Sequence, residues 1–186
     1  NVPLENVTPD HRRTAKAINF GLIYGMSAFG LTRQLGIPRN EAQAYLDTYF
    51  ERYTGVKDYM DSTKELAKKN LFVETILGRK LHVATINDPN GLRRKAAERA
   101  AINAPLQGSA ADIIKKAMID VDQWIGVNNP DIKMIMQVHD ELIFEVKKEF
   151  AVDALNEIVN LMECSVKLKI PLIVDANQGT NWNEAH

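Results

Sequence analysis

Four side chains near the start of the sequence recur every four residues and change from cationic to aromatic: Arg12, Lys16, Phe20 and Tyr24. On an α-helix each member of such a series is displaced by about 40° from the last, and the four span roughly 18 Å. They therefore predict one gently spiralling stripe. A nucleoside triphosphate has the matching gradient, because Arg and Lys bind its phosphates and an aromatic ring packs against its sugar or base. The alternative is a solvated basic face with Phe20 and Tyr24 in the core.

A second group of reactive side chains, His139, Asp140 and Glu141, separates two apolar segments rich in β-forming residues, 133–138 and 142–146. This pattern predicts a β-hairpin with a polar tip. If the chain stays extended at the tip, Asp140 faces one way and His139 and Glu141 the other. An exposed carboxylate at the end of a sheet suits Mg²⁺, which prefers oxygen ligands. The alternative is a turn whose polar residues simply face water.

The third group, Arg99, Asn103 and Gln107, again has a spacing of four and ends at a helix break marked by Pro105 and Gly108. Their donors have the chemistry to reach minor-groove acceptors, which occur in every base pair and carry little sequence information. Such contacts would test the geometry of a base pair without reading its sequence. The alternative is a polar helix surface with an amide beside the break.

These groups must be positioned by helices and strands in mixed order. Thr8 fits a helix N-cap and Pro9 the first helical position, and Pro105 with Gly108 predicts a kink or two helices in series. Periodicity and turn residues predict helices over residues 9–24, 31–35, 39–53, 56–69, 92–125 and 149–165, and strands over 72–76, 80–84, 133–138, 142–146 and 172–175. Helices come first and strands later, which predicts an α+β fold: a helical region followed by part of an antiparallel sheet with flanking helices.

The composition is that of a folded protein with two differently charged halves. Hydrophobic residues make up 45% of the 186 residues and charged residues 25%, which argues against a disordered tail. The single cysteine, Cys164, excludes an internal disulfide framework and a Cys-rich zinc site. The net charge is −1, yet residues 1–100 carry 16 Lys and Arg against 11 Asp and Glu, whereas residues 101–186 carry 7 against 13. The asymmetry indicates one surface suited to anions and another suited to cations.

In this order, the three groups together resemble the family A DNA polymerases, the bacterial members most closely. Residues 12–25 (RRTAKAINFGLIYG) match that family's nucleotide-binding helix, R-x-x-x-K-x-x-x-F-x-x-x-Y-G. Residues 137–141 (QVHDE) match its palm motif, which ends in His-Asp-Glu, and residues 99–108 (RAAINAPLQG) resemble the segment between them. The likeness covers nearly the whole chain, from about Leu4 to the terminal NWNEAH.

The resemblance implies nucleotidyl transfer with two Mg²⁺ ions, in which a primer 3′-hydroxyl attacks the α-phosphorus of a deoxynucleoside triphosphate and pyrophosphate leaves. Arg12 and Lys16 are expected to contact the triphosphate, and Lys16 also to assist catalysis. Phe20 is expected near the sugar; in this family a Phe here, in place of Tyr, goes with discrimination against sugars that lack the 3′-hydroxyl. Tyr24 is expected at the nascent base pair, where it guards fidelity.

The resemblance assigns the hairpin tip to the metal site. Asp140 is the expected metal ligand and a catalytic residue, with Glu141 supporting it. The residues expected to contact template or primer DNA are Arg99, Asn103, Gln107 and His139.

The chain departs from the family pattern in one respect. The family has a first metal-binding Asp upstream of the nucleotide-binding helix, in an Asp-Tyr-Ser type motif, whereas the acids near the start of this sequence are Glu5 and Asp10, without that context. We therefore expect a C-terminal portion of a polymerase: fingers over residues 1–90 and the C-terminal part of the palm over 91–186. The isolated chain is expected to be inactive or nearly so.

The implied partners are primer-template DNA and deoxynucleoside triphosphates, for a monomer without a membrane anchor in the cytoplasm and nucleoid of a bacterium. Two other interpretations stay open. A single-subunit RNA polymerase shares the Arg/Lys/Tyr-Gly helix, although Phe20 and the His-Asp-Glu segment favour DNA synthesis. A non-catalytic nucleic-acid-binding module would keep the fold without the chemistry.

Overall fold

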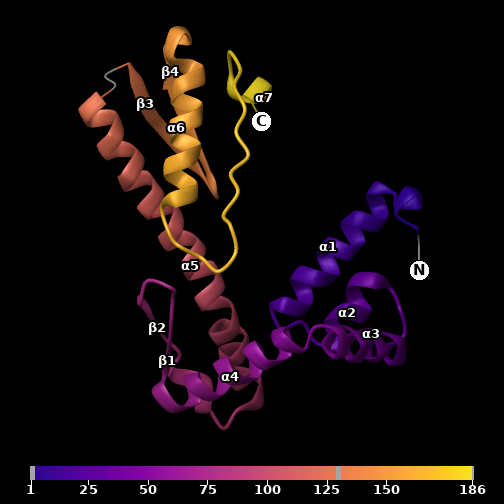
Figure 1. Cartoon of the computed structure of the whole chain (residues 1–186). Coiled ribbons are helices and arrows are strands. Elements are labelled where there is room, and N and C mark those ends of the chain that lie inside the picture. Colours follow the sequence, from indigo (N-terminus) through magenta and orange to yellow (C-terminus); the bar gives the residue numbers. More distant parts are fainter. Residues whose placement is uncertain (1–2, 129–130, 186) are drawn as a thin grey trace. The chain divides into compact units, whose positions relative to one another are not determined.

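The structure is a computed structural model that describes residues 3–128 and 131–185 (Figure 1). The chain divides into two compact units, residues 1–106 and residues 107–186. We call them the first and second unit. The division falls inside helix α5, Gly91–Asn128. The predicted boundary between fingers and palm, after residue 90, concerns what each region does and stays a prediction.

The first unit is mostly helical, with one small hairpin. Besides the first part of α5, it contains η1 (Leu4–Asn6), α1 (Pro9–Ile23), α2 (Ala28–Leu35), α3 (Arg39–Arg52), α4 (Thr54–Asn70), β1 (Phe72–Glu74), β2 (Lys80–His82) and η2 (Ala84–Asn87). Strands β1 and β2 are antiparallel, with Val73 opposite Leu81.

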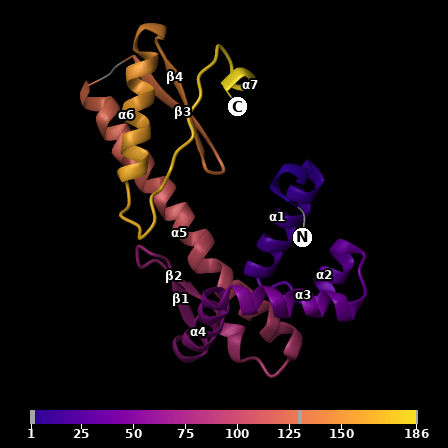
Figure 2. The same cartoon turned by 45° about the vertical axis from the view of Figure 1, so that its right-hand side comes forward.

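Two small apolar clusters hold the first unit together. Helices α2 and α3 lie side by side (Figures 1 and 2) around Leu31 and Ala42, both fully buried. Ile18 of α1 packs against this cluster, so the helix that carries the cationic-to-aromatic stripe rests on α2 and α3. The second cluster joins α4, the hairpin and α5, and comprises Ala67, Val73, Val83, Ile86, Ala97 and Ala101.

The second unit contains the second hairpin and a helix, α6 (Ala151–Cys164), that packs into the same core. Its elements after α5 are β3 (Ile132–Val138), β4 (Glu141–Val146), η3 (Lys148–Phe150), α6 (Ala151–Cys164) and α7 (Trp182–Ala185). Strands β3 and β4 are antiparallel, and a register shift between Met134 and Met136 marks a bulge in β3. The core of this unit is formed by Val121, Ile132, Ala154 and Ile158.

The α+β fold and most predicted elements are confirmed, because the apolar periodicity of the sequence matches the faces that become buried. The segment predicted as 31–35 is longer: α2 begins at Ala28, because the Ser27 side chain accepts a hydrogen bond from the Gly30 N–H and caps it. Of the two alternatives for 92–125, a pair of helices is wrong, since α5 continues through Pro105.

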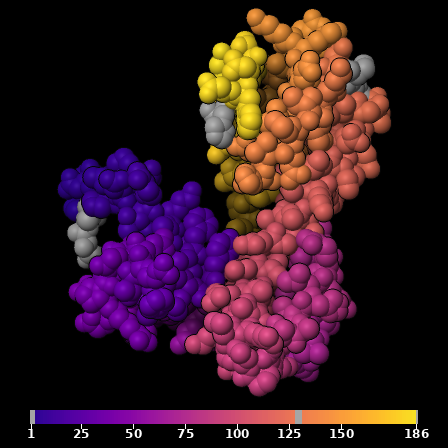
Figure 3. All heavy atoms as spheres, turned by 180° about the vertical axis from the view of Figure 1, so that it is seen from behind, coloured from indigo at the N-terminus to yellow at the C-terminus, as the bar shows by residue number. Residues whose placement is uncertain are grey.

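The predicted strand over residues 172–175 is also wrong. Among the residues that the structure describes, the segment has no strand partner, and the Val174 N–H donates to Glu163 Oε1 of α6 at 2.9 Å. A side chain therefore takes up a backbone donor that a sheet would have used. The C-terminal segment runs beside α6 instead (yellow beside orange in Figures 1 and 3).

No helix within residues 3–128 and 131–185 combines the length and apolarity needed to cross a bilayer.

Candidate functional site

Helix α1 begins with a hydrogen-bonded cap that fixes where its exposed face starts. The Thr8 N–H donates to His11 Nδ1 at 3.3 Å, and the His11 N–H donates to Thr8 Oγ1 at 3.2 Å. Pro9 occupies the first helical turn, where its missing N–H costs nothing. This reciprocal cap satisfies two donors immediately before Arg12. The sequence predicts the Thr8 cap but gives no signal for His11, because capping boxes usually carry Glu or Gln at that position.

The predicted stripe lies along one face of α1. Arg12 and Lys16 are exposed, Phe20 is 47% exposed and Tyr24 is half-buried. Lys16 Nζ lies 5.8 Å from the centre of the Phe20 ring, and the Phe20 and Tyr24 rings stack with centroids 6.2 Å apart. Arg13 pairs with Asp10 at 3.0 Å, whereas Arg12 has no ion-pair partner among the residues that the structure describes. The cationic end of the stripe is thus available to an anion, and the aromatic end is a pair of rings stacked on each other.

The end of α1 packs against the α5 turn that carries two predicted DNA-contacting residues. Gly25 follows Tyr24 with a φ of +78°, and a Cβ built there would lie 3.3 Å from Arg99 Cγ. Glycine is favoured here by the left-handed backbone, and a side chain at this position would also press against Arg99. Gly25, the residue after Tyr24, and Arg99 thus lie close together although they are far apart in the sequence.

The other members of the third group differ in their surroundings. Asn103 is half-buried, and its Oδ1 is buried without a hydrogen-bond partner among the described residues. Gln107 is exposed and is the first residue of the second unit. Arg99 and Asn103 belong to the same unit as α1, and Gln107 follows the boundary between the units, which falls inside α5.

The hairpin tip is a two-residue turn. Val138 pairs with Glu141, so His139 and Asp140 form the connection between β3 and β4. His139 adopts a φ of +54°, and its carbonyl accepts a hydrogen bond from Gln137 Nε2 at 2.9 Å. The expected alternation of Asp140 against His139 and Glu141 required an extended chain, and that premise is wrong because a tight turn needs left-handed backbone at this position.

The carboxylates at the tip have the donor chemistry of a magnesium site. Asp140 is exposed and Glu141 half-buried, and carboxylate oxygens are the ligands that Mg²⁺ prefers. Within residues 3–128 and 131–185, however, no three His, Cys, Asp or Glu side chains gather in a way that would hold a metal ion. The tip therefore fits one part of a metal site.

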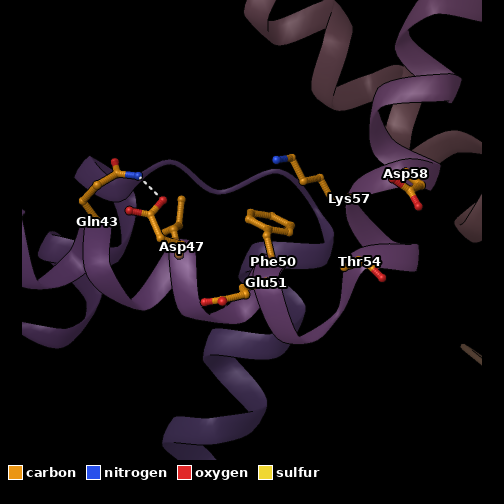
Figure 4. A pocket seen from close by; sticks show the side chains of 8 residues that line it. Gln43, Asp47, Phe50, Glu51, Thr54, Lys57 and Asp58 are labelled. Atoms are coloured by element: carbon orange, nitrogen blue, oxygen red, sulfur yellow. Dashed lines mark hydrogen bonds between the residues drawn. The ribbon is translucent and has the colours of Figure 1, made fainter.

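A groove of about 690 Å³ lies elsewhere in the first unit, on the inner side of the bend between α3 and α4 (Figure 4). None of the predicted site residues lines it. Its lining consists of Gln43, Leu46, Asp47, Phe50, Glu51, Thr54, Lys57 and Asp58. Sequence periodicity gave no signal for this groove, because it depends on the angle between two helices.

Comparison with known proteins identifies the class. The model of DNA polymerase family A matches residues 1–184. This chain belongs to DNA polymerase family A.

Individual relatives agree with that assignment. The chain is 55% identical to DNA polymerase I of Pseudomonas aeruginosa over 185 residues, which cover 100% of this chain and 20% of that protein. It is 49% identical to DNA polymerase I of Rhizobium leguminosarum over 191 residues, covering 100% of this chain and 19% of that protein. The chain thus spans about a fifth of the length of the curated relatives it matches.

A solved structure extends the likeness to three dimensions. The POL domain of Pol1 from M. smegmatis, in complex with DNA primer-template and dNTP, superposes with a TM-score of 0.95 at 43% identity. The match covers 99% of this chain and 32% of that one.

Proposed function

We propose that this chain forms the nucleotide-binding helix and part of the metal site of a DNA-directed DNA polymerase that serves replication and repair. The observation that carries the proposal is the stripe of exposed Arg12, Lys16 and Phe20 on α1, continued by half-buried Tyr24 at its C-cap, in a chain that belongs to DNA polymerase family A. In the reaction, the primer 3′-hydroxyl attacks the α-phosphorus of the incoming deoxynucleotide. The bond between the α-phosphorus and the oxygen that bridges the α- and β-phosphates breaks, and pyrophosphate leaves.

The stripe divides the triphosphate, sugar and base among its members. Arg12 offers a planar fork of donors suited to phosphate oxygens, and Lys16 offers a point charge. Both charges offset the negative charge that develops on the phosphates, and Lys16 thereby assists catalysis. Phe20 packs near the sugar and Tyr24 near the base, since aromatic rings pack against both and the two rings follow Lys16 in that order along the stripe.

The α5 residues and the hairpin tip complete the set. Arg99 lies beside the end of α1 and, with Asn103 and Gln107, is proposed to contact the minor groove of primer-template DNA, as is His139 near the primer terminus. Asp140 is the proposed metal ligand, with Glu141 in support. When bound, two Mg²⁺ ions lower the pKa of the attacking hydroxyl and stabilise charge on the leaving oxygens.

We further propose that the 186 residues alone extend a primer slowly or not at all. They supply Asp140 and Glu141, but the acids that precede α1's stripe are Glu5 and Asp10, outside any metal-binding context. As a monomer, the isolated chain would act as a DNA- and nucleotide-binding module, and its affinity for DNA would fall steeply with salt because phosphate contacts release counterions.

The test is a chimera in which these 186 residues replace the matching segment of the Pseudomonas aeruginosa DNA polymerase I. The chimera is expected to extend a primer with deoxynucleotides, and the isolated chain is not. A chimera that folds and binds DNA but does not extend would contradict the proposal. Equal use of ribonucleotides would instead support the RNA polymerase alternative, and rapid extension by the isolated chain would overturn the claim of inactivity.

A further inference from the structure

Tyr59 makes a long-range hydrogen bond that the stripe and hairpin do not explain. Its Oη, on α4, donates to the backbone carbonyl oxygen of Ile102, on α5, at 2.9 Å across 43 residues of sequence. Tyr59 is half-buried, and burial raises the pKa of its phenol above the ordinary value of 10.0. The hydroxyl therefore keeps its proton, and stays a donor, through the neutral range.

The acceptor, Ile102, lies in the α5 turn that contacts the end of α1. It is 3% exposed, and its Cδ1 would lie 3.8 Å from a Cβ built on Gly25. Arg99 Cγ would lie 3.3 Å from the same point. One turn of α5 therefore contacts two other segments. Tyr59 of α4 binds it by a hydrogen bond, and Gly25, which follows Tyr24, lies against it.

The same turn lacks one of the backbone hydrogen bonds of a regular helix, because α5 contains Pro105. Pro105 has no N–H, so it cannot donate to the carbonyl of Ala101, and its ring crowds that carbonyl. Asn103 adds a buried oxygen without a partner in the described part of the chain. The Tyr59 hydroxyl donates to the Ile102 carbonyl. That carbonyl is next to the Ala101 carbonyl, which Pro105 leaves without its helical donor. This hydrogen bond stabilises the turn from outside the helix.

We propose that Tyr59 is a positioning residue for nucleotide insertion: its hydroxyl fixes the Ile102 carbonyl and so holds the turn from Arg99 to Asn103 against the end of α1. Tyr59 touches neither DNA nor nucleotide in this role. It sets the distance between Tyr24, at the nascent pair, and the α5 donors that test the pair. The inference rests on the proposed function of those residues.

The first experiment measures the contact without any activity. Tyr59→Phe keeps the ring and removes the donor, so amide hydrogen exchange in residues 100–106 of the 186-residue chain is expected to rise roughly five- to tenfold. The matched control is Tyr45→Phe, whose ring is 54% exposed on α3, and it should leave this segment unchanged. Unchanged exchange in the Tyr59→Phe chain would overturn the proposal.

The second experiment uses the chimera. Tyr59→Phe is expected to lower kcat/KM for correct insertion about fivefold and for mismatched insertion less, so discrimination falls while the Kd for primer-template stays within about twofold. A lower Tm with unchanged discrimination would make Tyr59 merely structural and overturn the proposal. A chimera that is inactive without any substitution contradicts the proposed function instead, and hydrogen exchange still decides whether Tyr59 holds the turn.

Discussion

Helix α1 and the β3–β4 tip present opposite charges by different structural means. On α1, the helical repeat orders Arg12, Lys16 and the two aromatic rings along one face, and a cap fixes the first turn. At the tip, Asp140 sits in a two-residue turn, beside His139 with its φ of +54°. A helix thus suits an extended ligand that is read along its length, whereas a turn suits a ligand that binds at one point.

The two units differ in charge in the same sense. The five charges by which Lys and Arg exceed Asp and Glu in residues 1–100 belong to the first unit, and the acidic excess of residues 101–186 falls wholly in the second, because residues 101–106 carry no charge. A net charge of −1 therefore conceals two surfaces with different proposed partners, phosphates for one and Mg²⁺ for the other.

The largest expected effect is at the acidic β3–β4 tip. Asp140→Ala in the chimera should lower primer extension by roughly 100-fold or more, because charge at the reacting atoms loses its stabilisation, while the Kd for primer-template stays nearly unchanged. Rates of single-turnover extension and a DNA titration measure the two quantities. Asp153→Asn, exposed on α6, is the control, and equal loss of binding and extension would show that Asp140 is structural.

The next largest effect is expected at the cationic end of the stripe on α1. Lys16→Ala should raise the KM for deoxynucleotide in the chimera by on the order of tenfold, since hydrogen bonds to charged groups contribute about 1.5–3 kcal/mol. Steady-state kinetics with varied dNTP measure it. Arg33→Ala removes an exposed positive charge from α2 as a control for net charge. An unchanged KM in the Lys16 variant would remove Lys16 from the phosphate site.

A smaller effect tests whether α1 depends on its cap. Thr8→Ala removes the acceptor for the His11 N–H and should destabilise the 186-residue chain by about 1 kcal/mol. That corresponds to a Tm lower by roughly 2–4 °C for a chain of this size. Thr48→Ala on α3, where the Thr is exposed, is the matched control. Equal Tm values for the two variants would mean that the cap contributes nothing.

The smallest effect concerns the stability of the first unit at alkaline pH. All five tyrosines lie in the first unit, and burial raises the pKa of Tyr59 and of Tyr49. A raised phenol pKa adds stability below the unfolded value near 10, and that contribution is lost as the pH rises through the folded pKa. Tyr59→Phe should thus make the alkaline loss smaller, because the variant has no phenol to ionise at this position. Urea unfolding at pH 8 and 10.5 measures it, and an identical alkaline loss in both proteins would refute it.

Much of the first unit was predictable because its information is local. The stripe on α1, its start at Pro9 and its end near Gly25 follow from helical spacing, a Thr cap and a glycine. The strand predicted over 172–175 failed because a strand needs a partner, and apolar β-forming residues do not say whether one is there. The Glu163 carboxylate, three helical turns into α6, took up the Val174 N–H instead.

The sequence by itself determined the order of the chemistry: cations and rings on one helix, amides on a second, acids at a hairpin tip. Those patterns repeat at 3.6 or 2 residues, and backbone geometry alone turns them into faces. The tertiary structure decided which groups meet. Gly25 against Arg99, and Tyr59 on the Ile102 carbonyl, join residues 74 and 43 positions apart. Such contacts depend on how helices pack, which no local spacing encodes.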